Sequence, residues 1–283
     1  HFMGGAVLGA FPHIVYDAWL TNVCEKGGLI VVATPYELDT DHRRIATEAA
    51  RLRDRAIRAV SVREMYPPTL PIFGVGHSLG SKLHVLLACA AGGQSAEGDV
   101  EVVKEPPPLY AGHVLVAFNN ASAVDTVRLL ENFARTLLKK RSAEGGSQGD
   151  IFDSILGNMP AITVMAQRAA QAAGLEFNPD PPTTLEEARA SLRSPSVKMI
   201  KFKDDDLDMN ESLVDVLMKR FEVSYPGKVW TRELKGNHLT PVMVRVQGTN
   251  VSPLLKNFGA VNLGDEVAIE ELADVTVELI RKV

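Results

Sequence analysis

The sequence has little of several features that would each point to a particular class of protein. Only two of its 283 residues are cysteines, only 6% are aromatic, and acidic side chains outnumber basic ones, for a net charge of −5. Few aromatic side chains and a negative charge argue against a surface that stacks bases or attracts phosphates, so no nucleic-acid partner is expected. The longest apolar run, residues 85–91, is far shorter than the ~20 residues of a membrane-spanning helix, so no transmembrane segment is predicted.

What the sequence does contain is the composition of a folded chain, with 46% hydrophobic and 23% charged residues. Short apolar runs alternate with longer segments of helical period, which is typical of a parallel sheet with crossover helices. The strands expected from this pattern, all of them buried, are 29–34, 70–75, 113–118, 197–203 and 228–234. The helices expected from it include 41–64, 210–221 and 265–281.

One long segment interrupts the alternation of strands and helices. Residues 120–196 are mostly helical in period, but a Ser- and Gly-containing stretch at 142–147 and a proline-rich stretch at 179–182 divide them. We interpret 120–196 as a helical cap inserted into an α/β core that consists of residues 1–119 and 197–283. No linker separates two independent domains.

The clearest chemical motif is Gly-x-Ser-x-Gly at residues 76–80, between an apolar strand and an apolar helix. A serine at such a turn is held in a strained backbone conformation that exposes its hydroxyl, and Gly76 and Gly80 avoid a collision across the turn. Ser78 is therefore the candidate nucleophile. The helix begins beside it, so the backbone N–H of Leu79 is the candidate donor to a developing oxyanion.

A serine nucleophile needs a base, and the base needs an acid that orients it. His238 follows the last expected strand, and the acidic residues Asp204, Asp205, Asp206 and Asp208 follow the strand before it. Parallel sheets gather their catalytic groups at the carboxyl ends of the strands, and the chain order Ser, Asp, His matches the α/β-hydrolase arrangement. We predict Asp206 as the acid, because the residue just past the turn is best placed to reach back, with Asp205 as the alternative.

The chain opens with His1-Phe2-Met3-Gly4-Gly5, a pattern similar to the His-Gly loop that completes the oxyanion hole in α/β hydrolases. Phe2 stands where that loop usually has glycine. The second oxyanion donor is therefore predicted to be the N–H of Phe2 or of Met3. A strand precedes this loop in the fold, so further sheet strands are expected upstream of His1.

Two nucleotide-binding patterns and a calcium loop overlap these motifs and are rejected on spacing. Leu79 stands where a dinucleotide fingerprint has its third glycine, and the distance from Gly76 to Gly80 is one residue short for a phosphate loop. In the acidic run, Met209 occupies the position at which a calcium loop demands glycine. The predicted chemistry requires neither a cofactor nor a metal.

Several segments together resemble one family, the domain of unknown function 1350 family, over nearly the whole chain. They are His1-Phe2-Met3-Gly4-Gly5, the elbow at 76–82, Phe118-Asn119-Asn120, the acidic run at 203–208 and the histidine-containing segment 236–241. The resemblance implies an α/β-hydrolase fold, a catalytic triad and a plastid location. It implies no substrate, and the sequence itself shows no targeting pattern.

The residues and the resemblance predict a serine hydrolase acting on an ester or thioester acyl bond. Ser78 would attack, His238 would act as base and then as acid, and Asp206 would orient the histidine. Residues 151–177 are rich in Ile, Leu, Met and Ala, which suits an apolar or lipid-like substrate, although the same residues could simply pack cap helices together. The competing hypothesis is a non-catalytic scaffold of the same fold that binds a partner or pigment. The oligomeric state is not predicted.

Overall fold

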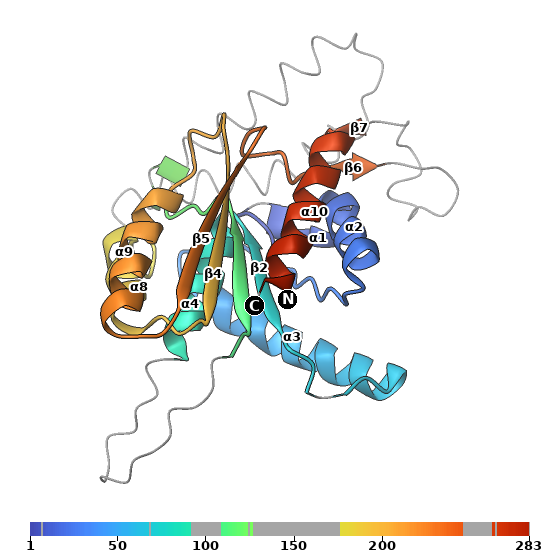
Figure 1. Cartoon of the computed structure of the whole chain (residues 1–283), viewed down its shortest axis with the longest axis horizontal. Helices are drawn as coiled ribbons and strands as arrows, with labels where there is room; N and C mark the ends of the chain where they lie inside the picture. The colour runs from blue at the N-terminus through green and yellow to red at the C-terminus, as the bar shows by residue number, and fades with distance from the viewer. Residues whose placement is uncertain are drawn as a thin grey trace.

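The computed structural model describes residues 1–6, 8–67, 69–91, 109–123, 125–126, 176–245, 262–263 and 265–282. Its centre is a five-stranded parallel sheet with the strand order β1-β2-β3-β4-β5 (Figure 1). The strands are β1 (Phe2–Met3), β2 (Phe73–His77), β3 (Gly112–Val116), β4 (Ser196–Phe202) and β5 (Lys228–Leu234). A separate antiparallel pair consists of β6 (Val244–Arg245) and β7 (Asn262–Leu263).

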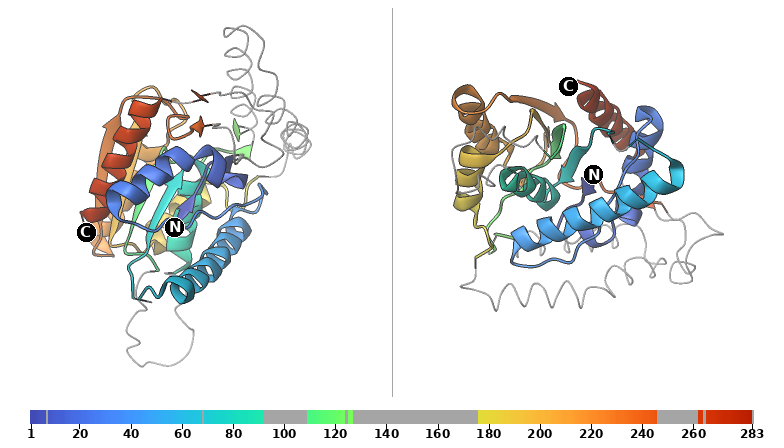
Figure 2. Two further views of the ribbon diagram at one scale, coloured as in Figure 1. Left: turned by 90° about the vertical axis from the view of Figure 1, so that its right-hand side faces the viewer. Right: turned by 90° about the horizontal axis from the view of Figure 1, so that it is seen from below.

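Helices cover both faces of this sheet (Figures 1 and 2). One face carries α1 (Pro12–Val15), α2 (Asp17–Gly27) and α10 (Glu266–Arg281), preceded by the short helix η1 (Leu8–Ala10). The other face carries α4 (Leu79–Ala90), α8 (Pro181–Ser191) and α9 (Asn210–Val223), with α3 (His42–Glu64) packed beside α4. Among the described helices, none is both long enough and apolar enough to cross a membrane.

The predicted strands and helices are largely confirmed, with shifts of one to three residues at their ends. The segment 29–34 is the exception, because it forms a single parallel bridge, from Ala33 to Phe2, and no strand. The Phe2 N–H donates to the Val32 carbonyl, and the Thr34 N–H donates to the Phe2 carbonyl. The neighbour of this segment, β1, is two residues long.

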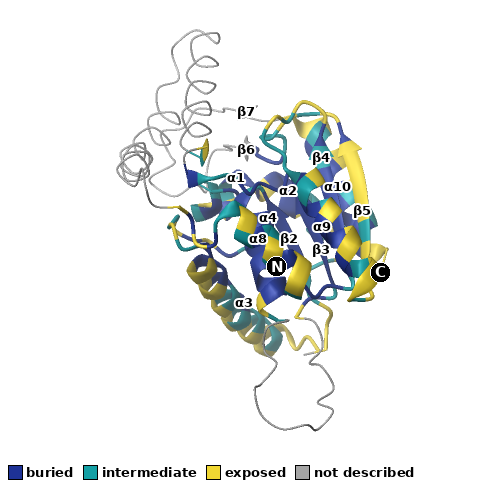
Figure 3. Cartoon of the chain, turned by 90° about the vertical axis from the view of Figure 1, so that its left-hand side faces the viewer, coloured by how far each residue is buried: buried dark blue, intermediate teal, exposed yellow. Residues whose placement is uncertain are grey.

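The prediction that all strands are buried is wrong for β5. Figure 3 shows this strand as an exposed edge of the sheet, and Lys228, Trp230 and Arg232 are all exposed. Among the described strands, β5 has a hydrogen-bonded neighbour, β4, on one side only. Its apolar contribution is limited to Val229, which packs against the core, and the buried Leu234.

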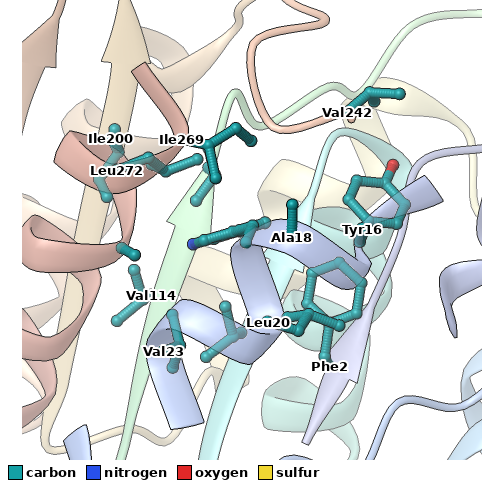
Figure 4. Close-up of a cluster of buried hydrophobic side chains, with 14 of the residues drawn as sticks. Phe2, Tyr16, Ala18, Leu20, Val23, Val114, Ile200, Val242, Ile269 and Leu272 are labelled. Atoms are coloured by element: carbon teal, nitrogen blue, oxygen red, sulfur yellow. The ribbon is translucent and has the colours of Figure 1, made fainter. Parts of the chain in front are cut away.

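Two apolar cores lie on the two faces of the sheet, because neighbouring residues of a strand point to opposite faces. Val114 and Val116 of β3 join the core under α2 and α10, where Figure 4 shows Ile200 and Leu272 around them. Leu115, between them, joins the core under α4, α8 and α9. A strand covered on both faces needs an unbroken apolar sequence, which explains the run at 113–118.

The predicted cap, residues 120–196, is described only in part. Helix α8 lies within that range, yet its Ala188, together with Leu192 just beyond it, belongs to the core cluster that also contains residues of β3, β4 and α9. Helix α8 therefore packs on the core, and the division into core and cap stays a prediction. Residues 127–175 lie outside the described residues, so the remainder of the cap stays a prediction.

Candidate active site

Ser78 lies at the sharp turn between β2 and α4. Its backbone angles are φ 55° and ψ −120°, a region that residues with side chains rarely adopt. Strain of this kind costs about 1–3 kcal/mol and persists only where the surrounding structure imposes it. The surrounding structure does so here, because the Ser78 N–H donates to the Val116 carbonyl at 2.9 Å and the Ser81 N–H donates to the Ser78 carbonyl at 3.0 Å.

Two glycines allow three pieces of backbone to meet at this turn. A Cβ on Gly76 would lie 2.6 Å from backbone atoms of Gly80 and Ser81, and a Cβ on Gly80 would overlap the carbonyl oxygen of Met3. The predicted steric role of both glycines is confirmed. Without a side chain on Gly80, β1 lies directly against the start of α4, and without one on Gly76, β2 does the same.

Three side chains from separate loops meet at the carboxyl edge of the sheet. The Nε2 atom of His238 lies 2.9 Å from Ser78 Oγ, and its Nδ1 atom lies 2.9 Å and 3.1 Å from the two carboxylate oxygens of Asp205. The side chain of Asp205 is fully buried, whereas that of His238 is 14% exposed. A hydroxyl, an imidazole and a carboxylate linked in this order allow the imidazole to accept the hydroxyl proton.

The structure places Asp205, the alternative candidate, beside His238, and does not bring Asp206, the preferred one, to this position. β4 ends at Phe202, one residue earlier than predicted, and the turn that follows it is displaced by the same one residue. Asp205 Oδ1 also accepts the Leu207 N–H at 2.9 Å, and this local turn holds the carboxylate toward His238. Asp206 is exposed.

Backbone hydrogen bonds hold the loop that carries Asp205 against the loop that carries His238. The Lys203 N–H donates to the Leu234 carbonyl at 2.9 Å, and the Asp204 N–H donates to the Gly236 carbonyl at the same distance. The two loops therefore extend the pairing of β4 with β5 past the strand ends. This extension sets the separation between the carboxylate and the imidazole.

Asn119 connects the same acidic loop to the serine turn, and we did not predict it as a site residue. It lies three residues after Val116, the last residue of β3, and its Nδ2 donates to the Leu207 carbonyl at 2.9 Å. Its backbone N–H lies 3.4 Å from the Ser78 carbonyl oxygen. The sequence signal that pointed to it is its place in Phe118-Asn119-Asn120, a segment that carries the family resemblance.

The opening segment of the chain approaches Ser78, but with different residues from those predicted. The Phe2 N–H donates to the Val32 carbonyl at 2.8 Å, so the prediction of Phe2 as an oxyanion donor is wrong. Met3, the other candidate, is a residue of the β1–β2 ladder and does not belong to the loop. In the loop itself, Gly5 lies beside the serine, since a Cβ on Gly5 would lie 3.3 Å from Ser78 Cβ.

Leu79, the remaining predicted donor, is the first residue of α4. The first N–H groups of an α-helix have no partner within the helix, and the Ser78 side chain makes no capping bond to this one. The Leu79 N–H therefore occupies the position at which this kind of turn offers a donor to an oxyanion. Within the described residues, no cluster of His, Cys, Asp or Glu side chains is arranged to hold a metal ion.

His77, the residue before the serine, has hydrogen-bond partners on both ring nitrogens, which we did not predict. Its Nδ1 lies 2.8 Å from the Tyr16 hydroxyl, and its Nε2 lies 2.9 Å from the backbone carbonyl oxygen of His238. A carbonyl oxygen only accepts, so the ring proton is on Nε2. Burial, followed by the nearby His238, holds the pKa of His77 well below its usual value, so the ring is neutral.

The parallel sheet, the serine turn and the loops at its carboxyl edge define an α/β-hydrolase fold, as predicted. Residues 1–263 match the family described as a protein of unknown function, DUF1350. The chain belongs to this family, which confirms the resemblance seen in the sequence. No curated protein sequence matches the chain.

Solved structures of α/β hydrolases are similar to this chain. Carboxyl esterase 2 from the mycorrhizal fungus Tuber melanosporum has a TM-score of 0.51 and 15% identity, covering 99% of this chain and 74% of that chain. The S-formylglutathione hydrolase FrmB of Staphylococcus aureus has a TM-score of 0.45 and 13% identity, covering 99% of this chain and 79% of that chain. At such low identity the likeness to the esterase shows the fold alone.

A second carboxyl group, that of Asp208, lies near Asp205 and is partly buried. Its Oδ1 accepts the Asn210 N–H at 2.8 Å, but its Oδ2 has no hydrogen-bond partner among the described residues. Its pKa is raised to about 6, chiefly because burial disfavours the charged form and also because the Asp205 charge is close. Ionisation of Asp208 therefore opposes folding.

We expect the stability of Asp208→Asn, compared with that of the wild type, to be greater at pH 7 than at pH 4. In the unfolded chain this carboxyl loses its proton near pH 4, whereas in the folded protein it keeps the proton to about pH 6. The wild type therefore loses stability as the pH rises through this window, and an amide loses none. The difference in Tm, variant minus wild type, should grow by about 2–4 °C between pH 4 and pH 7. Asp206→Asn, at an exposed neighbour, is the control, and a difference in Tm that does not change with pH would contradict the argument.

Proposed function

We propose that this protein is a serine hydrolase that cleaves an ester or thioester acyl bond. The observation that carries the proposal is the hydrogen-bonded chain from Ser78 through His238 to Asp205, at a strained strand-to-helix turn. The backbone strain at Ser78 supports the same conclusion, since the fold would be more stable without it.

The proposed reaction begins when Ser78 Oγ attacks the acyl carbon while His238 Nε2 takes the serine proton. The Nδ1–H of His238 donates to Asp205, which stabilises the imidazolium. When the tetrahedral intermediate collapses, the leaving alcohol or thiol takes the proton from Nε2 and an acyl-serine remains. Water, activated by the same imidazole, then attacks this ester and releases the acid and the free serine.

The negative charge that develops on the acyl oxygen requires hydrogen-bond donors. In this proposal the Leu79 N–H is one of them, because it begins α4 beside the nucleophile. The second donor comes from the loop after β1, residues 4–6. Within that loop, the Gly5 N–H already has a hydrogen-bond acceptor, because it donates to the Tyr16 hydroxyl at 2.9 Å.

A fluorophosphonate probe should label the wild-type protein at Ser78, because such probes react with an activated serine hydroxyl. Ser78→Ala should abolish labelling and lower any turnover by roughly 10³-fold or more, since the nucleophile and its base act as a unit. Labelling and its position are measured by intact-protein and peptide mass spectrometry. Ser81→Ala, three residues along the same helix, is the control and should still be labelled.

Absence of labelling in the folded wild type at any pH between 6 and 9 would favour a non-catalytic scaffold. Labelling of Ser78→Ala at the wild-type rate would show that another residue reacts and would contradict the assignment of the nucleophile. Either result is readable only if the variant unfolds with a Tm close to that of the wild type.

Asp205→Asn should slow labelling of Ser78 far more than Asp206→Asn does. An amide at position 205 can still contact His238, but it neither stabilises the imidazolium nor enforces the correct tautomer, and the loss in a comparable triad is about 10⁴-fold. Asp206 is exposed and makes no contact with the imidazole, so its variant should react within about twofold of the wild type. Equal losses in the two variants, measured as second-order labelling rates, would contradict the role of Asp205.

An apolar or lipid-like acyl group is the substrate class that we propose. The support is compositional, because residues 151–177 are rich in Ile, Leu, Met and Ala, including Ile151, Ile155, Leu156 and Met159. These four residues lie outside the described residues. In this proposal the cap, and not the triad, carries substrate choice, since the same triad serves hydrolases of many kinds.

The rate of ester hydrolysis should rise with acyl chain length over several carbons if these apolar residues line the acyl site. Each buried methylene contributes about 0.8 kcal/mol, so the rise should be steep before a steric limit is reached. Ile155→Gln should flatten the rise and leave the hydrolysis of acetate esters nearly unchanged. A flat profile for the wild type, in assays with p-nitrophenyl esters, would contradict the apolar substrate class.

A further inference from the structure

We propose that His77 and Tyr16 are positioning residues, which hold the backbone of His238 in place and connect it to the loop after β1. The proposal deepens the proposed function and rests on it. Neither residue touches the reacting atoms, and neither is part of the Ser78–His238–Asp205 chain. Their effect on the reaction would pass through the position of the base.

The three hydrogen bonds of this network fit together in one direction only. The Gly5 N–H can only donate, so the Tyr16 oxygen accepts from it at 2.9 Å and the Tyr16 hydroxyl hydrogen points to His77 Nδ1 at 2.8 Å. The His238 carbonyl can only accept, so His77 Nε2–H donates to it at 2.9 Å. Each donor therefore has one acceptor, and a continuous chain runs from the loop after β1 to the backbone of the base.

Both side chains are held firmly by their surroundings. Tyr16 is fully buried, and its ring packs edge-on against Phe2 with a centroid distance of 4.9 Å. Figure 4 shows Tyr16 at the border of the apolar cluster, with its hydroxyl oxygen directed away from the ring of Phe2. His77 is 1% exposed. Buried polar groups need their partners, so neither side chain can turn away without leaving an unsatisfied group.

The contact with the carbonyl adds a third fixed point to His238. Its two ring nitrogens are already fixed by Ser78 and Asp205, but a side chain can keep both contacts only if its backbone stays still. β5 ends at Leu234, so the backbone at 238 lies four residues beyond the sheet. The bond from His77 ties this loop residue to the end of β2, next to the nucleophile.

The choice of histidine at position 77 follows from the charge that forms beside it. The rings of His77 and His238 lie 5.1 Å apart, so a positive charge on the first would oppose the formation of imidazolium on the second. The neutral His77 ring offers a donor on one side and an acceptor on the other without adding charge. Lysine or arginine would add charge, and an apolar side chain would leave the Tyr16 hydroxyl hydrogen and the His238 carbonyl without the partners that His77 gives them.

Two substitutions at position 77 separate the two contacts. The amide of glutamine reaches the place of Nε2, so His77→Gln keeps a donor for the His238 carbonyl and loses the acceptor for Tyr16. The amide of asparagine reaches the place of Nδ1, so His77→Asn keeps the acceptor for Tyr16 and loses the donor for the carbonyl. Each variant removes one hydrogen bond, and the two should therefore lose similar amounts of stability.

The experiment compares the second-order rate of fluorophosphonate labelling of Ser78 in the folded variants at 25 °C. We expect His77→Asn to react about tenfold more slowly than the wild type and His77→Gln to stay within about threefold of it. A purely structural role would lower the Tm of both variants and move neither rate. Equal rates in the two variants, with the wild type labelled, would overturn the positioning role and leave the proposed function intact.

Tyr16→Phe tests the other end of the chain, with Tyr110→Phe as a matched control. Tyr110 is equally buried, and its hydroxyl also has two partners, His1 Nδ1 at 2.8 Å and Arg53 Nη1 at 2.5 Å, but it lies before β3, at the opposite end of the strands. Both variants should have a lower Tm, and only Tyr16→Phe should also slow labelling, by about threefold or more. A slowing of equal size in both would overturn the proposal.

The proton positions can be read without any activity. In ¹⁵N-histidine-labelled wild type, NMR should show His77 as a neutral ring with its proton on Nε2 from pH 5.5 to pH 9, and Tyr16→Phe should shift its Nδ1 resonance. A His77 ring that titrates in this range, or that carries its proton on Nδ1, would overturn the chain. Wild type that shows these resonances but is never labelled would overturn the proposed function, and the positioning role with it.

Discussion

The close approach of three backbone segments at the serine turn is the constraint on which the rest of this structure depends. The backbones of Met3, Gly76 and Gly80 meet where no further side chain fits, so β1 lies beside β2 and α4 starts immediately after Ser78. A Cβ on Gly80 would force β1 away from α4, and a Cβ on Gly76 would force β2 away from it. The same contact keeps Ser78 in its strained conformation and sets the first free N–H of α4 beside it, so the fold and the candidate site have a single geometric origin.

The parallel ladder carries this geometry across the sheet to the other two groups. Val116 of β3 accepts the Ser78 N–H, and β4 and β5 are paired in register up to Phe202 and Leu234. Because parallel strands end at the same edge, Asp205, three residues past β4, and His238, four residues past β5, arrive on the same side as Ser78. Residues far apart in the sequence thus need only short loops to meet.

The sequence predicted those features of this arrangement that short local patterns encode, and it missed those that depend on residues far apart in the chain. The serine turn and His238 were found because a motif and a strand end are local patterns. The choice between Asp205 and Asp206 was missed because it depended on the last residue of β4, and strand ends are the least certain part of such a pattern. The contact of Tyr16 with His77 joins residues 61 positions apart, and no local pattern encodes it. The exposure of β5 followed from its place at the edge, which composition does not reveal.

The groups around His238 are arranged for a charge that appears only during the proposed reaction. A proton that reaches Nε2 from Ser78 makes a positive ring, which meets the carboxylate of Asp205 on one side and the neutral ring of His77 5.1 Å away on another. Burial keeps His77 neutral, because its charged form would lose its hydration and would be repelled by His238. The imidazole at position 77 therefore supplies a hydrogen bond without a competing charge. An apolar residue would supply no hydrogen bond, and a cationic residue would add a charge.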